Sequence, residues 1–220
     1  MIKITLLFTA ILLSANLFSQ TITDFFENLP DSSILNLSKE QRRIITKYSA
    51  DNKSYEDAMD DIYEKKMAHA FSVVDLKNGY LKLVGNYDSH LQMCYWNFKN
   101  GNKLIAVYQE SCGPVCYVER FDFFLYNKKN YTPVSYNSVI PDIEPSFFKG
   151  NYTANKKKMS KDDVIAEMLF DLPRNGKNIV AKWGNEDLPE IYKKYGFIGD
   201  RMNLVWNDGK FTIGQVYWNE

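Results

Sequence analysis

The chain has 220 residues, of which 27 are basic and 27 are acidic, so its formal net charge at neutral pH is zero. A nucleic-acid-binding protein normally carries a basic face, and this balance therefore argues against a nucleic-acid partner. The length is sufficient for one domain, or two small ones, with a substantial hydrophobic core.

Residues 1–19 have the pattern of a cleavable export signal. Lys3 precedes an apolar run from Ile4 to Leu13, and small and polar residues follow as far as Ser19. A charged head, an apolar run of about 7–15 residues and a small residue before the cut are typical of a secretory signal peptide. A membrane span needs about 20 apolar residues, which neither this run nor any later segment reaches. We expect cleavage after Ser19 and a periplasmic or secreted protein; the alternative is a buried N-terminal strand or helix.

Three helices are predicted between residues 20 and 66. Thr23 is placed to cap a short first helix, which Pro30 interrupts. Ser38 and Ser54 each begin a segment in which a Gln or an Asp follows three residues later, the pattern of a capping box. The acidic residues of the third helix lack the glycine and the spacing of a calcium-binding loop, so we interpret them as a solvated helix face.

Five strands are predicted next, because aromatic and β-branched residues are concentrated in segments 71–76, 80–84, 91–98, 103–109 and 117–126. Asn-Gly pairs at 78–79 and 100–101 separate successive segments, and Asn-Gly favours the type I′ turn of a two-residue β-hairpin. We therefore expect an antiparallel meander. A two-residue turn at 100–101 would place Cys94 opposite Val107.

The chain has three cysteines, Cys94, Cys112 and Cys116. Outside the cytoplasm, nearby thiols tend to form disulfides. The Gly113-Pro114 turn can fold the chain back so that Cys112 and Cys116 meet, which an extended strand would not allow. We favour a Cys112–Cys116 disulfide; two free thiols, or a bridge from Cys94 to either of the others, are the alternatives. The hairpin register counts against the Cys94 bridges and favours a buried free thiol.

Residues 127–220 contain a second group of predicted elements. An edge strand near 131–136 and a Pro-containing linker precede a helix over 161–168, which Ser160 would cap. Strands are expected at 169–172, 178–183, 202–206 and 210–217, with a helix at 188–195 between the two hairpins. The fold class is therefore α+β, with antiparallel β-meander hairpins and helices packed on one face.

The same pattern indicates the domain organisation. Residues 1–19 form the signal, residues 20–145 the N-terminal helices and antiparallel sheet, and residues 146–220 a C-terminal helix and hairpins that pack with the preceding half. Asn-Gly turns at 78–79 and 175–176 occupy similar places in the two parts. They suggest two loosely repeated helix-plus-sheet halves; reuse of a common turn is the alternative.

Three segments carry a resemblance to a known family: FFENLPDS at 25–32, NGYLKL at 78–83 and CGPVC at 112–116. Together with the signal-like N-terminus, they resemble a family of exported proteins of Gram-negative bacteria that is known as a domain of unknown function. The resemblance covers most of residues 20–143. It implies export and the fold type, and it implies no activity, cofactor or site residue.

No catalytic, cofactor or metal site stands out in the sequence. Asp88, Ser89 and His90 are the residue types of a catalytic triad, but a triad is assembled in space from separate segments, so contiguous residues indicate a turn. Cys94 lies in an apolar strand, which favours the core over a reactive thiol beside His69 or His90. The sequence lacks the glycine-rich loop of nucleotide-binding proteins, and we expect no cofactor.

Two hypotheses about function follow. A carboxylate-dependent hydrolase of cell-envelope or extracellular polymer needs two carboxyl groups about 5–10 Å apart in a cleft, one with a raised pKa; the candidates are Glu110, Glu119, Asp122, Asp142 and Glu144. A non-catalytic binding protein would hold a protein or a glycan on an open aromatic sheet face; the candidates are Trp96, Tyr108, Tyr117, Trp183 and Trp206. Each of these aromatic side chains could instead pack in the core beneath the helices. We favour the binding protein and leave its partner and oligomeric state open.

Overall fold

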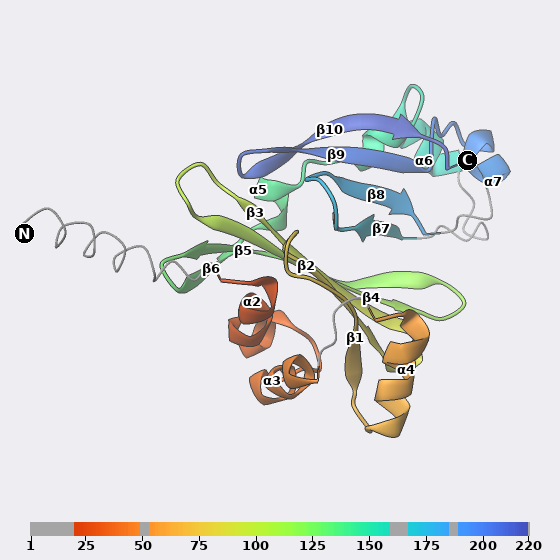
Figure 1. Cartoon of the computed structure of the whole chain (residues 1–220). Helices are drawn as coiled ribbons and strands as arrows, with labels where there is room; N and C mark the ends of the chain where they lie inside the picture. Colours follow the sequence, from red (N-terminus) through yellow and green to blue (C-terminus); the bar gives the residue numbers. More distant parts are fainter. Residues whose placement is uncertain (1–19, 49–52, 159–166, 185–188, 220) are drawn as a thin grey trace, which may run out of the picture.

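The structure is a computed structural model that describes residues 20–48, 53–158, 167–184 and 189–219. The predicted export signal and most of the predicted helix at 161–168 lie outside the described residues. Two antiparallel sheets stack on each other, and helices cover the far side of the first sheet (Figure 1). The α+β class and the meander order of the strands are confirmed.

The first sheet has six strands that follow one another in chain order. They are β1 (His69–Asp75), β2 (Tyr80–Gly85), β3 (Ser89–Asn97), β4 (Lys103–Cys112), β5 (Cys116–Asn127) and β6 (Asn130–Val134). A 3₁₀ turn, η3 (Asn86–Asp88), joins β2 to β3. Each strand pairs antiparallel with the next, so the sheet is a simple meander.

The β3–β4 turn differs from the predicted two-residue hairpin. The Phe98 N–H donates to the Asn102 carbonyl oxygen (2.9 Å), which makes residues 99–101 the loop. Gly101 has φ 85°, the left-handed conformation that the last residue of a three-residue hairpin loop adopts. One residue more in the loop shifts the pairing of the two strands.

The shifted pairing corrects the predicted neighbour of Cys94. Cys94 lies opposite Ala106, whereas a two-residue turn would have placed it opposite Val107. The Cys94 side chain is buried and its thiol is free, as the sequence predicted. Burial raises the pKa of this thiol, so it stays protonated and unreactive.

The N-terminal helical elements are α2 (Ile22–Asn28), η2 (Asp31–Ser33), α3 (Lys39–Lys47) and α4 (Tyr55–Glu64). Ser38 and Ser54 cap α3 and α4 with complete capping boxes, as predicted. The cap of α2 is Thr21 and not Thr23, because the Asp24 carboxylate accepts the Thr21 N–H (2.7 Å) and completes a capping box two residues earlier than expected.

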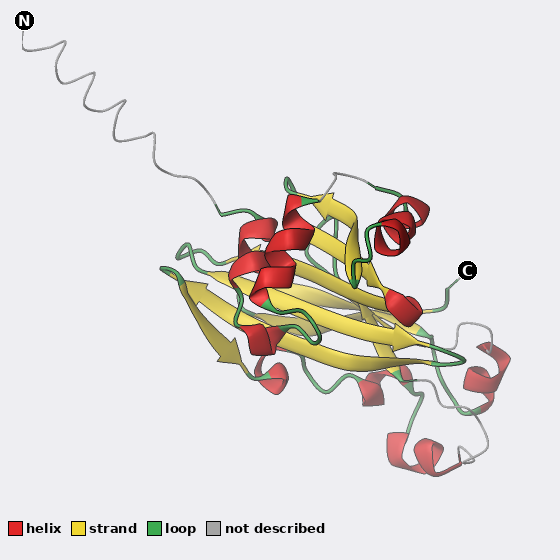
Figure 2. Cartoon of the chain, turned by 90° about the horizontal axis from the view of Figure 1, so that it is seen from below, coloured by secondary structure: helices red, strands yellow, loops and turns green. Residues whose placement is uncertain are grey.

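Helices α2 and α3 cover one face of the first sheet, and Figure 2 shows them lying across its strands. Phe25 and Phe26 of α2 and Ile45 of α3 are buried in one cluster with Leu83 and Met93 of the sheet. Removing such apolar side chains from water is the main stabilising contribution to this layer.

Helix α4 lies beside the end of β1 (Figure 1). Its Ala58 and Ile62 pack against Ala70 and Val84. These two sheet residues alternate along their strands with the residues that face α2 and α3, so α4 packs on the other side of β1.

The second sheet has four strands in the order β10-β9-β8-β7. They are β7 (Met168–Asp171), β8 (Ile179–Trp183), β9 (Arg201–Asn207) and β10 (Lys210–Tyr217), with α7 (Pro189–Lys194) between β8 and β9. Met168, which was expected at the end of a helix, instead begins β7.

The segment between the sheets was predicted as a linker but contains three short helical elements. They are α5 (Tyr136–Val139), η4 (Glu144–Phe147) and α6 (Tyr152–Lys158). Val139, Ile140, Ile143 and Phe147 are buried in the core between the sheets. This burial holds the segment against the protein, which its polar composition did not indicate.

Aromatic and aliphatic side chains fill the layer between the two sheets. Trp96 Nε1 donates to the Lys177 carbonyl oxygen (2.8 Å), and the Leu172 N–H donates to the Gln92 side-chain oxygen (2.9 Å). These bonds link the two sheets and satisfy polar groups inside the layer. Among the helices of the described ranges, none has the length and apolar character to cross a membrane.

Candidate functional site

A β-bulge in β5 decides which side chains face each side of the first sheet. Gln109 of β4 pairs with Arg120, but the next residue, Glu110, pairs with Val118, so Glu119 is an extra residue on β5. Such a bulge changes the direction of the side chains around it. The residues of β5 before and after the bulge therefore do not follow one regular alternation, and the cavities on the two sides of the sheet are lined by different residues of this strand.

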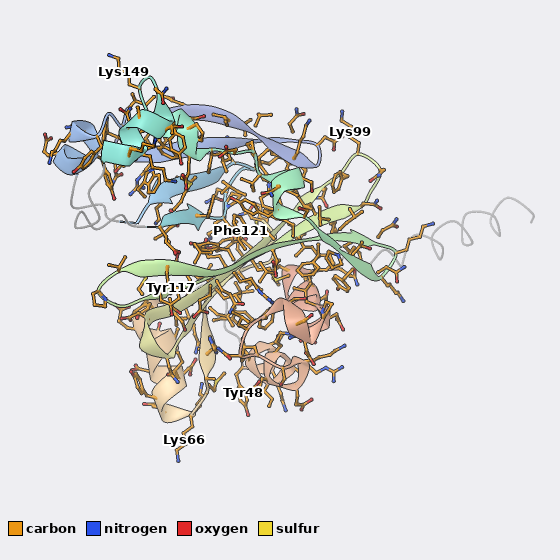
Figure 3. The ribbon with its side chains drawn as sticks, turned by 180° about the vertical axis from the view of Figure 1, so that it is seen from behind. Tyr48, Lys66, Lys99, Tyr117, Phe121 and Lys149 are labelled. Carbon is orange, nitrogen blue, oxygen red and sulfur yellow. A yellow bond between two sulfur atoms is a disulfide. The ribbon has the colours of Figure 1, made fainter. Side chains whose placement is uncertain are left out.

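Tyr117 and Phe121 show the effect of the bulge. Tyr117 lies opposite Ser111, whereas Phe121 lies opposite Tyr108. In Figure 3, Phe121 lies between the two sheets and Tyr117 lies on the other side of the β4–β5 hairpin. In a regular strand, two residues four positions apart would face the same way.

The larger cavity, which we call the edge cleft, has a volume of about 940 Å³ and lies between β5 and β7. The segment from α5 to α6 and Trp183 of β8 complete its walls. Aromatic side chains dominate the lining: Phe121, Tyr136, Phe148, Tyr152, Phe170 and Trp183. A concave, mostly apolar cavity with a few polar groups is the usual form of a ligand site.

The aromatic side chains of the edge cleft support one another. The Phe121 ring centroid lies 4.7 Å from that of Phe170 and 5.7 Å from that of Tyr136. On the opposite wall, the Phe148 and Tyr152 rings meet edge to face at 5.2 Å. These contacts hold the walls in place, so the cavity is largely preformed.

Carboxylates give the edge cleft an acidic character. Its charged lining residues within the described ranges are Asp142, Glu144, Glu167 and Lys156. Lys156 Nζ lies 2.8 Å from the Glu144 carboxylate, which also accepts a hydrogen bond from the Tyr152 hydroxyl. Burial raises the pKa of Glu144, but the hydrogen bonds from Lys156 and Tyr152 outweigh this and lower it.

The edge cleft adjoins an unpaired strand edge. Strand β6 pairs only with Phe123–Asn127, so within the described chain the preceding half of β5 has a strand neighbour on one side only. The Val118 N–H in this half donates to the Glu167 carboxylate (2.9 Å) and not to a backbone carbonyl. A sheet edge of this kind is a template for pairing with another chain.

The smaller cavity, which we call the sheet-end pocket, has a volume of about 520 Å³ and lies on the α2–α3 side of the sheet. Polar residues of β1, β3, β4 and β5 line it, together with the loop before α3: His69, Ser89, Ser111, Glu119, Tyr117 and Asn36. His69 pairs with Gly85 and Ser89 with Ser111, so these side chains form a row across neighbouring strands.

Three of the five aromatic residues predicted to form an open binding surface are buried, which corrects that prediction. Trp96, Tyr108 and Trp183 are 3%, 0% and 6% exposed. The second sheet covers the face on which Trp96 and Tyr108 lie, a stacking that the strand pattern alone does not show. Trp206 is half-buried against Trp96 (5.5 Å between ring centroids), and only Tyr117 is largely exposed, at 49%.

The predicted carboxylates are dispersed and do not form one pair. Asp142 and Glu144 line the edge cleft, and Glu119 lines the sheet-end pocket. Asp122 pairs with Arg120 (3.1 Å). Glu167 of the edge cleft was not among the predicted carboxylates, and its only signal in the sequence is an acid placed just before a strand.

Glu110 has the raised pKa expected of a catalytic acid, but it does not line either cavity. Burial raises its pKa, and the hydrogen bond from the Tyr108 hydroxyl (2.7 Å) offsets this only in part. The Tyr108 oxygen also accepts the Phe170 N–H (3.1 Å). This arrangement joins the two sheets and places Glu110 in a structural network.

The remaining candidates flank the β4–β5 turn or lie around the start of β3. The Cys112 and Cys116 sulfur atoms lie at disulfide-bonding distance, with their Cα atoms 4.0 Å apart. Ser89 and His90 are adjacent on β3 and point to opposite faces, so with Asp88 they do not form a triad. The described residues contain no group of three or more His, Cys, Asp or Glu side chains that could hold a metal ion.

Together, the stacked sheets and the two cavities define an α+β protein with a preformed acidic cleft at a sheet edge. Residues 14–170 match the model of the family described as "Protein of unknown function (DUF3256)", and the chain belongs to this family. The resemblance found in the sequence is thereby supported as a domain of unknown function. No curated protein matches the chain.

A solved structure shares the fold. It is described as a domain of an uncharacterized protein from Porphyromonas gingivalis W83, and it has 15% sequence identity and a TM-score of 0.62. The comparison covers 88% of this chain and 97% of that chain. At this identity the likeness shows the fold alone.

Proposed function

We propose that this protein is an exported, non-catalytic binding protein whose edge cleft holds an extended segment of a partner protein. One observation carries the proposal: the aromatic cleft directly adjoins the half of β5 that lacks a second strand neighbour. Apolar pockets beside an open strand edge are the two components of peptide recognition by strand addition.

The backbone of β5 favours a protein over a glycan as the ligand. The Val118 N–H points away from β4, and the Glu167 carboxylate occupies the place that a partner carbonyl would take. A peptide strand offers carbonyl and N–H groups at the spacing of a β-ladder, which a glycan does not. Binding would exchange the Glu167 contact for a backbone hydrogen bond.

The charges of the cleft indicate the composition of the segment. Among the described lining residues, the acids Asp142, Glu144 and Glu167 outnumber the one cation Lys156, which is already paired with Glu144. A segment with apolar side chains for the aromatic walls and one basic residue near Asp142 would complement this lining.

The alternative function, a hydrolase that uses paired carboxylates, has less support. Its acid would need a raised pKa and a place in a cleft. Glu110 has the raised pKa but does not line the cleft, whereas Glu144 lines the cleft but has a lowered pKa and is paired with Lys156.

Export is a separate part of the proposal, and the sequence of residues 1–19 supports it. Protein isolated from its native cells and sequenced from the N-terminus should begin at Gln20. A start at Met1, with the protein in the cytosol, would contradict it.

Selection from a displayed library of short random peptides tests the binding proposal, with the chain from residue 20 as the target. Enriched peptides should be extended, aromatic or aliphatic, and basic at one position. Val118→Pro should abolish their binding because it removes the outward N–H while breaking no backbone hydrogen bond of the sheet.

A matched pair of variants tests the role of charge. Asp142→Asn should lower the affinity for the selected peptides about threefold to tenfold, whereas Asp208→Asn in the β9–β10 turn should not change it. Equal binding by the Val118→Pro variant, with its circular dichroism unchanged, would refute strand addition. Turnover of an envelope polymer by the purified protein would favour the hydrolase.

A further inference from the structure

Two polar residues that line the sheet-end pocket, His69 and Ser89, approach Gly85 so closely that only a glycine fits there. Gly85 has an extended backbone (φ −129°, ψ −176°), a conformation that any residue can adopt. A Cβ at this position would lie 2.6 Å from His69 Nε2 and closer still to Ser89 Oγ. Space, and not backbone freedom, therefore requires glycine here, and His69 Nε2 and Ser89 Oγ both lie close to this position.

The hydroxyl groups of this pocket have already used their hydrogen atoms. Ser89 Oγ donates to the Asn86 carbonyl oxygen (3.0 Å), and Ser111 Oγ donates to the Glu119 carboxylate (2.7 Å). A serine hydroxyl has one hydrogen and two lone pairs, so each of these oxygens can only accept a further bond. Toward a ligand, the Ser89 and Ser111 oxygens and the second Glu119 oxygen are therefore acceptors.

Glu119 is the one charged side chain among the described residues that line the pocket at neutral pH. Burial lowers the pKa of His69, although Glu119 acts in the opposite direction. Burial, assisted by Lys82, lowers the pKa of His90 to about 4. Both histidines are therefore neutral, and His69 Nε2 is available as another acceptor when the ring proton is on Nδ1.

An exposed aromatic ring completes the pocket. Tyr117 is 49% exposed and lies directly across from Ser111 on the neighbouring strand. The face of an aromatic ring attracts cations, and the attraction is stronger where water is partly excluded.

We propose that the sheet-end pocket binds an organic cation that carries several N–H donors, a primary ammonium or a guanidinium group. Glu119 neutralises its charge, the Ser89 and Ser111 oxygens accept its hydrogen bonds, and Tyr117 stacks against it. This site is independent of the edge cleft and of the function proposed for that cleft. The cation is either a free amine or the side chain of a lysine or arginine on another protein.

Titration of the ¹⁵N-labelled chain from residue 20 tests this proposal. The probes are n-butylammonium and Nα-acetyl-lysine N-methylamide, and their neutral counterparts are 1-butanol and Nα-acetyl-norleucine N-methylamide. The cationic probes should shift the amide signals of Gly85, Ser89, Ser111 and Glu119 saturably, and the neutral ones should not. Saturation by the free amine alone indicates a small-molecule ligand, and saturation by the lysine derivative indicates a protein side chain; both support the chemistry.

Two variants give the size of the effect. Glu119→Gln keeps an acceptor for Ser111 but removes the charge, and it should lower the affinity for the cationic probes about tenfold. Tyr117→Leu lies at an exposed position and should not affect folding, and it should lower the affinity for the cationic probes about threefold. Glu190→Gln, which removes an exposed acid on α7, should leave binding unchanged. The proposal fails if neither cation shifts these amides, if the neutral probes bind equally well, or if Glu119→Gln binds as wild type.

Discussion

The edge cleft and the sheet-end pocket both take residues from β5, yet they differ in chemistry. Val118 and Phe121 face an aromatic, largely apolar cleft, whereas Tyr117 and Glu119 face a pocket of polar acceptors. The bulge at Glu119 separates the two sets. The comparison shows that one extra residue lets a single strand serve two unlike cavities, because the alternation of side chains resumes in a new phase after the bulge.

The largest expected difference between the two cavities is in stability. Phe170 of the edge cleft is 5% exposed and packs on Phe121 and Tyr108, whereas Tyr117 of the pocket is 49% exposed. Phe170→Ala should lower the free energy of unfolding by about 3–5 kcal/mol, because it leaves a cavity in the inter-sheet core. Tyr117→Ala should change it by about 0.5 kcal/mol or less. Urea denaturation of both variants measures the free energy of unfolding, and equal losses would show that Phe170 and Tyr117 contribute equally to stability.

The next effect concerns the hydrogen bonds that join the sheets behind the cleft. Tyr108→Phe leaves Glu110 without its donor and the Phe170 N–H without its acceptor. Unfolding free energy should fall by about 1–3 kcal/mol, since buried polar groups would lose their partners. Tyr63→Phe, at a residue that is 71% exposed, is the matched control and should be neutral. A neutral Tyr108→Phe would mean that water replaces the hydroxyl.

The disulfide should affect the pocket more than the cleft. Cys112 lines the sheet-end pocket, and the bridge closes only the short β4–β5 turn. Replacing both cysteines by serine should cost about 2 kcal/mol or less, because the closed loop is small. Cation binding in the pocket should weaken while peptide binding in the cleft is retained. Alkylation of the denatured, unreduced protein should modify one thiol, Cys94; modification of three would exclude the disulfide.

The smallest effect is a pH dependence of the unfolding free energy. It comes from His90, which lies on the side of the sheet that faces β8. Burial and Lys82 lower its pKa to about 4, Asp88 opposes this, and Lys182 lowers it further. The unfolded chain therefore binds a proton at higher pH than the folded chain, and stability that is present above pH 6.5 is lost as the pH falls toward 4. Because the ring is partly solvated, we expect this loss of unfolding free energy to be about 1 kcal/mol.

His90→Gln should reduce this loss when urea unfolding is compared at pH 7 and pH 4.5. Carboxylates titrate in the same range, so the difference between wild type and variant is the quantity to measure. His69 has a lowered pKa as well, and His69→Gln should act in the same direction. An unchanged pH dependence in His90→Gln would show that this ring is solvated in the folded state.

Local features of the sequence predicted most of the elements and two of the three acidic lining residues of the edge cleft. Ser38 and Ser54 cap their helices as expected, because a capping box depends on residues only three positions apart. Asp142 and Glu144 were candidates, but Glu167 and Phe121 were not. Nothing near Phe121 in the sequence indicates that a strand from the second sheet lies beside it.

The sequence by itself determined the α+β class, the meander order and the caps of α3 and α4, because alternation, turns and caps depend on near neighbours. Only the tertiary structure decided that Trp96 and Tyr108 are core residues, that a bulge at Glu119 separates two cavities, and that Ser89 approaches His69 across Gly85. These features depend on which face of one sheet meets another and on strand pairing between distant segments. The free energy of such contacts comes from residues far apart in the chain, and no local pattern records it.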